Sequence, residues 1–178
     1  MLLLLVDFHT HLWSRSHLRG EFVDGLKRVW GDEFSRKIVR ATPEHHFAAE
    51  RSVDKVIVFG LQAKKSGCMV PNDYVAEYVR SHPDRLIGFA SVDPNEEGAE
   101  KELKRCIKKL GLRGLKLGPI YQHFDPTSSK GMRIFELAQE LEIPVVIHQG
   151  TTFVRNAPLK YANPIQLEEV ALRFPDLT

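Results

Sequence analysis

The chain has 178 residues, of which 43% are hydrophobic and 27% are charged, as in an ordinary soluble globular protein. A net charge of +2 without a long basic run gives no reason to expect nucleic acid as a partner. The apolar residues 1–6 are too short to span a bilayer and lack the basic region of an export signal, and Cys68 and Cys106 match no metal or redox spacing. We therefore expect a cytoplasmic protein with reduced thiols and no membrane partner.

The first predicted strand, residues 3–8, leads into the segment Asp7-Phe8-His9-Thr10-His11. Alternate side chains of a strand share a face, so His9 and His11 point the same way, roughly 6.6 Å apart along the strand. Imidazole nitrogen binds zinc, iron and manganese, and such a pair can hold one ion. Taken alone, however, a His-x-His pair is more typical of a half-exposed strand. Asp7 is predicted to share the face of His9. It is expected either to accept a hydrogen bond from a ligand imidazole or to be a buried polar residue with its own hydrogen-bond partners.

A lid segment, residues 12–52, is predicted to follow the first strand. It is too long for an ordinary connection between strand and helix, since most have about two to six residues. Helical patterns at residues 21–37 and 43–51 indicate small helices that pack locally. The histidines of the lid segment are expected at the surface rather than as ligands: His17, His45 and His46.

Strand and helix signals alternate through the rest of the chain. Strands are predicted at residues 55–60, 86–92, 112–117 and 143–148, and helices at residues 72–81, 96–110, 130–141 and 163–174. Such alternation is typical of βαβ units around a parallel sheet. The predicted fold class is therefore α/β.

Five strand signals are fewer than the eight of a closed βα barrel. We predict a TIM-type (β/α)8 barrel of which this chain, residues 1–178, holds about the first five βα units as one domain truncated at its C-terminal end. An open, doubly wound five-stranded sheet is the alternative. The barrel is favoured because an isolated five-stranded piece would leave a sheet edge and the barrel interior uncovered.

The predicted strand 143–148 ends in His148. Its histidine therefore stands at the C-terminal end of a strand, as His9 and His11 do after the first strand. In parallel strands the C-terminal ends lie on one face, which carries the active site of βα barrels. Three imidazoles can therefore converge there. A hydrogen-bonded core histidine is an equally good interpretation of His148 by itself.

Three further residues are candidates for the same face. Lys116 shares a strand face with Gly114 and Gly118, and therefore points into the predicted barrel near its rim. Trp13 follows the histidine pair directly, and His123 lies in the loop segment 121–124; both are candidates to line a substrate pocket. Loop aromatics are at least as often ordinary packing residues.

Four segments together resemble the metal-dependent amidohydrolase superfamily, and within it amidohydrolase family 2, which includes aminocarboxymuconate-semialdehyde decarboxylase-like enzymes. They are residues 7–13 (DFHTHLW), 88–94 (GFASVDP), 114–117 (GLKL) and 144–148 (PVVIH), within a likeness that covers all 178 residues. The resemblance implies an eight-stranded barrel with His9, His11 and His148 as ligands of one divalent metal ion, zinc before manganese or iron. A histidine from the sixth strand and an aspartate from the eighth would complete that site, and this sequence contains neither strand.

The resemblance implies a metal-dependent hydrolase or decarboxylase that acts on a small carboxylated or cyclic substrate. Lys116 is then expected to bind substrate or to form an ion pair. A metal-bridging role, as in binuclear members of the superfamily, is the less favoured interpretation. The expected partner is a small molecule, and a homo-oligomer is compatible with the sequence. The alternative is a non-catalytic fragment or scaffold that needs a partner chain or the missing C-terminal part.

Overall fold

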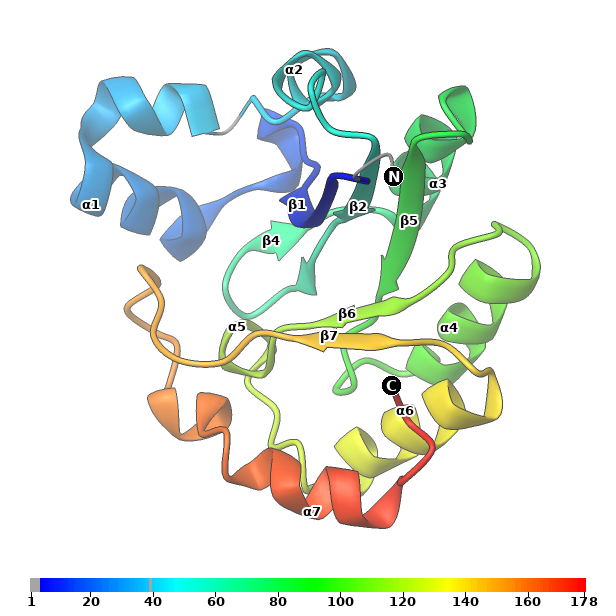
Figure 1. The fold of residues 1–178 in the computed structure, drawn as a ribbon. Helices are drawn as coiled ribbons and strands as arrows, with labels where there is room; N and C mark the ends of the chain where they lie inside the picture. Colours follow the sequence, from blue (N-terminus) through cyan, green and yellow to red (C-terminus); the bar gives the residue numbers. More distant parts are fainter. Residues whose placement is uncertain (1–3, 39) are drawn as a thin grey trace.

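The computed structural model describes residues 4–38 and 40–178. Its main sheet has five parallel strands in the order β1-β2-β5-β6-β7 (Figure 1). Their bounds are β1 (Val6–His11), β2 (Lys55–Phe59), β5 (Leu86–Ser91), β6 (Leu115–Leu117) and β7 (Val145–Ile147). Neighbours in the sheet follow one another along the chain, apart from a small hairpin. The strand order is that of a barrel built unit by unit.

The helices that follow the strands are α3 (Asn72–Ser81), α4 (Ala99–Lys108), α6 (Ser129–Glu140) and α7 (Gln166–Arg173). The lid segment forms α1 (Gly20–Ile38) and α2 (Pro43–Ala49). Short elements complete the fold: α5 (Pro119–Gln122), the 3₁₀ segments Arg15–His17 and Leu159–Ala162, and the antiparallel pair β3 (Gln62–Ala63) and β4 (Cys68–Met69). The sequence did not predict this pair.

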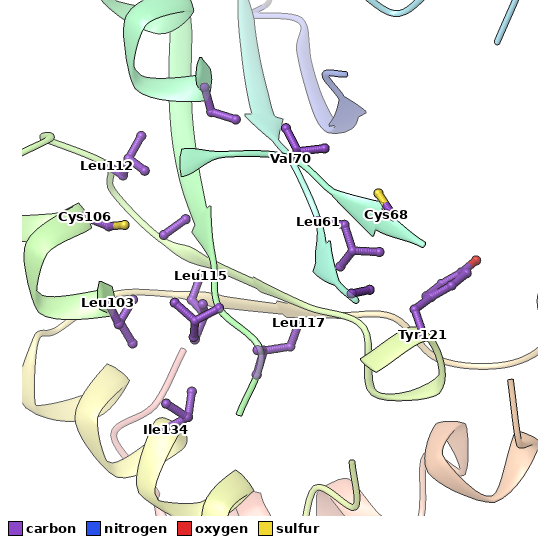
Figure 2. Close-up of a cluster of buried hydrophobic side chains, with 14 of the residues drawn as sticks. Leu61, Cys68, Val70, Leu103, Cys106, Leu112, Leu115, Leu117, Tyr121 and Ile134 are labelled. Carbon is purple, nitrogen blue, oxygen red and sulfur yellow. The ribbon is translucent and has the colours of Figure 1, made fainter. Parts of the chain in front are cut away.

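The two faces of the sheet bury different apolar clusters. Val56 and Val58 of β2 belong to the larger cluster. The same cluster includes Leu103 of α4 and Ile134 of α6 (Figure 2). Ile57 and Phe59, which alternate with them, form a smaller cluster with Phe89 of β5 on the other face. This second face is the inner face of the half-barrel, and it carries the side chains that point toward the site.

An irregularity in β1 changes the predicted alternation. Asp7 is paired with Val56 but Thr10 with Val58, so two residues of β1, Phe8 and His9, lie opposite one residue of β2. Such a bulge reverses the face on which the preceding residues lie. Asp7 is therefore in register with a residue of the helix-side core rather than on the inner face. The prediction that Asp7 shares the face of His9 is wrong for this reason.

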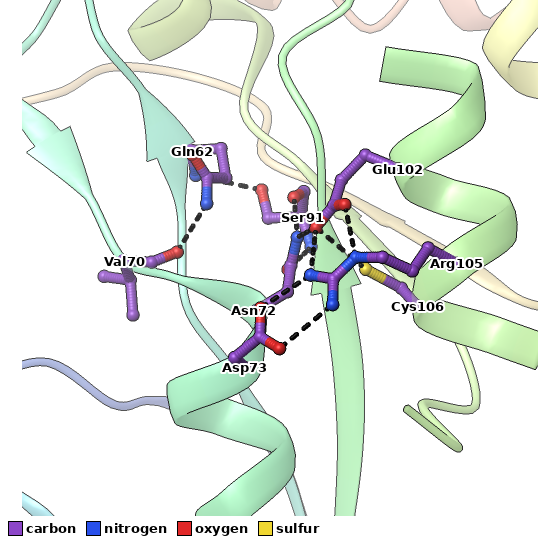
Figure 3. A network of polar contacts seen from close by, with 8 residues as sticks. All are labelled: Gln62, Val70, Asn72, Asp73, Ser91, Glu102, Arg105 and Cys106. Atoms are coloured by element: carbon purple, nitrogen blue, oxygen red, sulfur yellow. Dashed lines mark hydrogen bonds and ion pairs between the residues drawn. The ribbon is translucent and has the colours of Figure 1, made fainter. Parts of the chain in front are cut away.

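A partly buried polar network joins α3, β5 and α4 (Figure 3). The Asn72 side chain donates to the Ser91 carbonyl at 3.0 Å and to Glu102 at 2.9 Å, and it accepts a hydrogen bond from the Ser91 amide at 2.8 Å. Arg105 of α4 forms ion pairs with Glu102 and Asp73. Because Asn72 satisfies both backbone groups of Ser91, the network fixes α3 and α4 beside the end of β5.

The sheet does not close on itself within residues 4–38 and 40–178. β1 and β7 are its two edge strands, and Phe8 of β1 is 55% exposed. The Val145 amide donates to the Thr178 carbonyl at 2.8 Å, so the chain at residue 178 runs beside β7. The prediction of a TIM-type barrel of which the chain holds about five βα units is confirmed. None of the helices in the described ranges has the length and apolar character needed to cross a membrane.

Candidate metal and substrate site

A cavity of about 230 Å³ lies at the C-terminal ends of the parallel strands. One wall is polar and comes from the strand ends: His9, His11, Lys116 and His148. The other wall is aromatic and comes mostly from the lid segment and the loops: Trp13, Phe22, Tyr121 and Phe153. The three predicted ligand histidines and Lys116 are thus brought to one cavity, as the parallel topology requires.

His9 and His11 lie next to each other at the end of β1. Their ring centroids are 5.4 Å apart, and both rings meet the Phe59 ring edge-on, at 5.0 and 4.7 Å. The Nδ1 atom of His11 is buried without a hydrogen-bond partner among the described residues. A buried imidazole nitrogen without a partner is costly unless a ligand or metal ion satisfies it.

His148 follows β7 and reaches the cavity from the other side. Its backbone amide donates to the Leu117 carbonyl at 3.0 Å, which continues the pairing of β7 with β6. The ring Nε2 lies 3.2 Å from the Thr151 carbonyl, and the ring meets that of Tyr121 edge-on at 4.9 Å. Because a carbonyl can only accept, this hydrogen bond assigns the proton to Nε2 and leaves Nδ1 unprotonated, with a lone pair available.

The cavity favours neutral imidazoles. Burial lowers the pKa of His9, His11 and His148, and the positive charge of Lys116 lowers each further. A histidine binds a metal ion only in its neutral form, so the electrostatics of this wall hold all three side chains in the form that a ligand needs.

Lys116 is the charged member of the polar wall. Its side chain is 1% exposed, and its Nζ has no hydrogen-bond partner in the described part of the chain. Burial lowers the pKa of Lys116 to about 8. A buried ammonium without a partner is unfavourable, and an anionic group entering the cavity would relieve that cost.

The described residues form no group of three His, Cys, Asp or Glu side chains close enough to hold one metal ion. The three histidines therefore share a cavity without forming a finished coordination sphere. Their chemistry nevertheless fits a divalent ion, since His11, whose Nδ1 has no hydrogen-bond partner among the described residues, lines the same cavity as two further neutral imidazoles.

The other two candidates are placed differently. Trp13 lines the cavity, where its ring lies 5.2 Å from that of His11. His123 is not among the lining residues: it ends α5 with a positive φ of 56°, and its ring stacks on Tyr161 at 6.3 Å. Phe22 of α1 and Phe153 of the loop after β7 were not predicted to line the cavity, because no spacing rule indicates which residues of these long segments return to the strand ends.

A family model described as Amidohydrolase matches residues 6–178. Over 97 residues, 52% of this chain, the sequence is 32% identical to 2-amino-3-carboxymuconate-6-semialdehyde decarboxylase of Dictyostelium discoideum, of which the match covers 27%. The fold is similar to that of an uncharacterised TIM-barrel protein of Bordetella bronchiseptica, with a TM-score of 0.74 and 19% sequence identity. The match covers 99% of this chain and 65% of the Bordetella chain.

A second solved structure is 5-carboxyvanillate decarboxylase of Novosphingobium aromaticivorans, determined with bound manganese. The match covers 98% of this chain and 57% of the decarboxylase chain, with a TM-score of 0.68 and 20% sequence identity. The chain thus spans less than two thirds of the length of these proteins, and the two structures show a shared barrel fold. Because the family model covers almost the whole sequence, the chain belongs to the amidohydrolase family, as the motif around His9 and His11 predicts.

Proposed function

We propose that the protein is a metal-dependent decarboxylase of a small carboxylated, cyclic substrate, with hydrolysis of such a substrate as the second candidate. The observation that carries the proposal is the polar wall, where three neutral histidines and an unpartnered lysine line one cavity. The decarboxylase named among the relatives favours carbon–carbon cleavage over hydrolysis.

His9, His11 and His148 would hold one divalent ion, zinc or manganese. When bound, such an ion would supply Lewis acidity, which polarises a substrate oxygen or activates water. The manganese found in the neighbouring decarboxylase supports a metal of this class. The family's remaining ligands would come from strands six and eight, which lie outside residues 1–178.

Lys116 would bind the anionic group of the substrate. Its ammonium has no hydrogen-bond partner among the described residues, and it shares the cavity with His9, His11 and His148. A carboxylate placed there would form a charge-assisted hydrogen bond with Nζ and would be held next to the histidines. Substrate binding is proposed ahead of metal bridging. A bridging lysine needs ligands for a second metal ion, and no carboxylate of the described residues lines this cavity.

The lid segment, residues 12–52, would close the cavity and limit the entry of water. Trp13 and Phe22 bring aromatic surface from this segment to the cavity, and their rings lie 5.8 Å apart. Exclusion of water strengthens the interaction between Lys116 and an anionic group. His46 of α2 is buried rather than at the surface, so part of the lid is anchored in the core.

The alternative is a non-catalytic fragment or scaffold that needs a partner chain or further barrel strands. The open sheet edges favour it for residues 1–178 alone. The proposed activity is therefore tested on the protein expressed from its complete reading frame.

The experiment is an assay of carbon dioxide release and substrate loss with a panel of hydroxybenzoates and unsaturated dicarboxylates, alongside a panel of lactones. Release of one carbon dioxide per acid consumed, lost after chelation and restored by zinc or manganese, is the expected result. Turnover that survives complete metal removal, or no turnover on either panel in metal-loaded protein, would count against the proposal.

A further inference from the structure

The loop between β7 and the 3₁₀ segment Leu159–Ala162 contributes Phe153 to the cavity lining and packs on the lid segment. It is tied to three places: the Arg155 amide donates to Glu21 at 3.3 Å, the Asn156 side chain donates to the Lys65 carbonyl at 3.1 Å, and the Gly150 amide donates to the Ala162 carbonyl at 3.2 Å. The β7 loop, residues 149–158, is therefore held against the lid segment, the turn between β3 and β4, and the 3₁₀ segment.

Phe153 is the residue of the β7 loop that reaches the aromatic wall. Its ring meets those of Phe22 at 5.0 Å and Trp30 at 5.4 Å nearly edge-on, and lies 6.3 Å from that of Tyr121. Phe22 and Trp30 belong to α1, so this ring joins the lid to the loop. The same ring lines the cavity that His9, His11 and His148 also line.

Gly25 of α1 permits this approach. A Cβ atom at Gly25 would lie 2.6 Å from the Phe153 carbonyl oxygen and 2.9 Å from Cδ2 of its ring. Both distances are shorter than real side chains allow, and the carbonyl cannot turn away as a flexible side chain can. The absence of a side chain at position 25 thus sets how deeply the β7 loop enters the site.

The volume of the cavity that Phe153 helps to line then limits what it holds. About 230 Å³ accommodates a single substituted ring, whose flat face would meet the aromatic wall while its anionic group meets Lys116. A fused second ring would have to displace the Phe153 side chain.

We propose that Phe153 is a specificity-determining residue, which selects planar single-ring carboxylates over larger fused-ring ones, and that Gly25 is the positioning residue that holds it. This inference rests on the proposed function for the identity of the anionic ligand. It adds a source of selectivity on the β7 loop, distinct from the histidines that are proposed to hold the metal ion.

The test is calorimetric binding of two probes, 2-hydroxybenzoate and 3-hydroxy-2-naphthoate, to the metal-loaded protein from the complete reading frame. Wild type should bind the single-ring probe more tightly. Phe153→Ala should shift the affinity ratio toward the naphthoate by about tenfold, because the space of one aromatic side chain is opened. Leu159→Ala, which removes an exposed apolar side chain near the same loop, should leave the ratio unchanged.

Gly25→Ala tests the positioning role. It should weaken binding of 2-hydroxybenzoate by about fivefold in wild type and by less than twofold when Phe153 is already alanine, since coupled residues have non-additive effects. Asp24→Ala, at an exposed neighbouring position of α1, is the matched control. Additive effects of Gly25→Ala and Phe153→Ala would overturn the positioning role.

An unchanged probe ratio in Phe153→Ala, or a wild-type protein that binds neither probe, would overturn the proposed selectivity. The readout is binding alone, so it is separate from turnover. A protein that binds the probes with the expected ratio but decarboxylates nothing would contradict the proposed function and leave the role of Phe153 standing.

Discussion

The Lys116 ammonium nitrogen lies 4.9 Å from the centroid of the Phe59 ring, and both side chains are almost completely buried. The negative face of the ring stabilises the charge, but a ring cannot replace the hydrogen bonds that the ammonium loses on burial. His9 and His11 meet the same ring edge-on, so one phenylalanine of β2 holds the lysine and both histidines together.

Replacement of Lys116 by methionine should separate function from stability. We expect kcat/KM to fall at least tenfold, because the anionic group of the substrate loses its charged partner. The thermal midpoint should stay the same or rise, because a buried, unpartnered charge is replaced by an apolar side chain of similar length. Lys109→Met, at an exposed position, controls for removal of a positive charge. A large fall in the thermal midpoint would show that Lys116 has a structural partner in the complete protein.

Substitutions in the network around Asn72 should differ sharply in cost. Asn72→Ala leaves the buried amide and carbonyl of Ser91 without their partner, and we expect the free energy of unfolding to fall by about 2–3 kcal/mol. Asp73→Asn breaks an ion pair with Arg105 in which the Asp73 side chain is 62% exposed, and should cost less than about 1 kcal/mol. Urea denaturation measures both values. Equal costs would contradict the role given to Asn72.

His46 should make stability dependent on pH. Its Nδ1 lies 2.9 Å from the Tyr78 hydroxyl, and burial lowers its pKa, an effect that the charge of Asp7 partly opposes. Because the pKa is lower in the folded than in the unfolded protein, the unfolded state binds more protons in acid. The stability associated with neutral His46 is thus complete above about pH 6.5 and is lost as the pH falls toward the folded pKa.

The comparison is the free energy of unfolding between pH 5 and pH 8 for wild type, His46→Phe and His45→Asn. His46→Phe should have a shallower decline in acid, although other histidines with lowered pKa values leave part of the slope. His45 is exposed, so His45→Asn should retain the wild-type slope. A slope unaffected by His46→Phe would contradict the assignment.

Much of the scaffold could be predicted from local pattern. The helix predicted at residues 72–81 has those bounds in the structure, and β2 and β5 lie within their predicted strands. The first strand is displaced from residues 3–8 to Val6–His11, and residue 3 of the prediction lies outside the described residues. The positions of His9, His11 and His148 followed from parallel strands, since a strand end fixes the side of the sheet on which a residue lies.

Features that depend on long-range packing could not be predicted. The bulge at Phe8 and His9 has no signal in the alternation of residue types, yet it decides the face of Asp7. His46 was predicted at the surface because its helix is short and polar. In the structure it is buried, and its ring contacts the Tyr78 hydroxyl of α3. Phe153 is distant in sequence from Gly25, and only the fold brings the two together.

The central claim is that two strands supply His9, His11 and His148 to one metal ion, and metal content measures it directly. Protein from the complete reading frame, purified without chelator and equilibrated with zinc or manganese, is analysed by mass spectrometry of the metal. We expect about one ion per chain in wild type and in His45→Ala, and less than a tenth of that in His148→Ala with unchanged circular dichroism. No bound ion in wild type, or full occupancy in His148→Ala, would contradict the account.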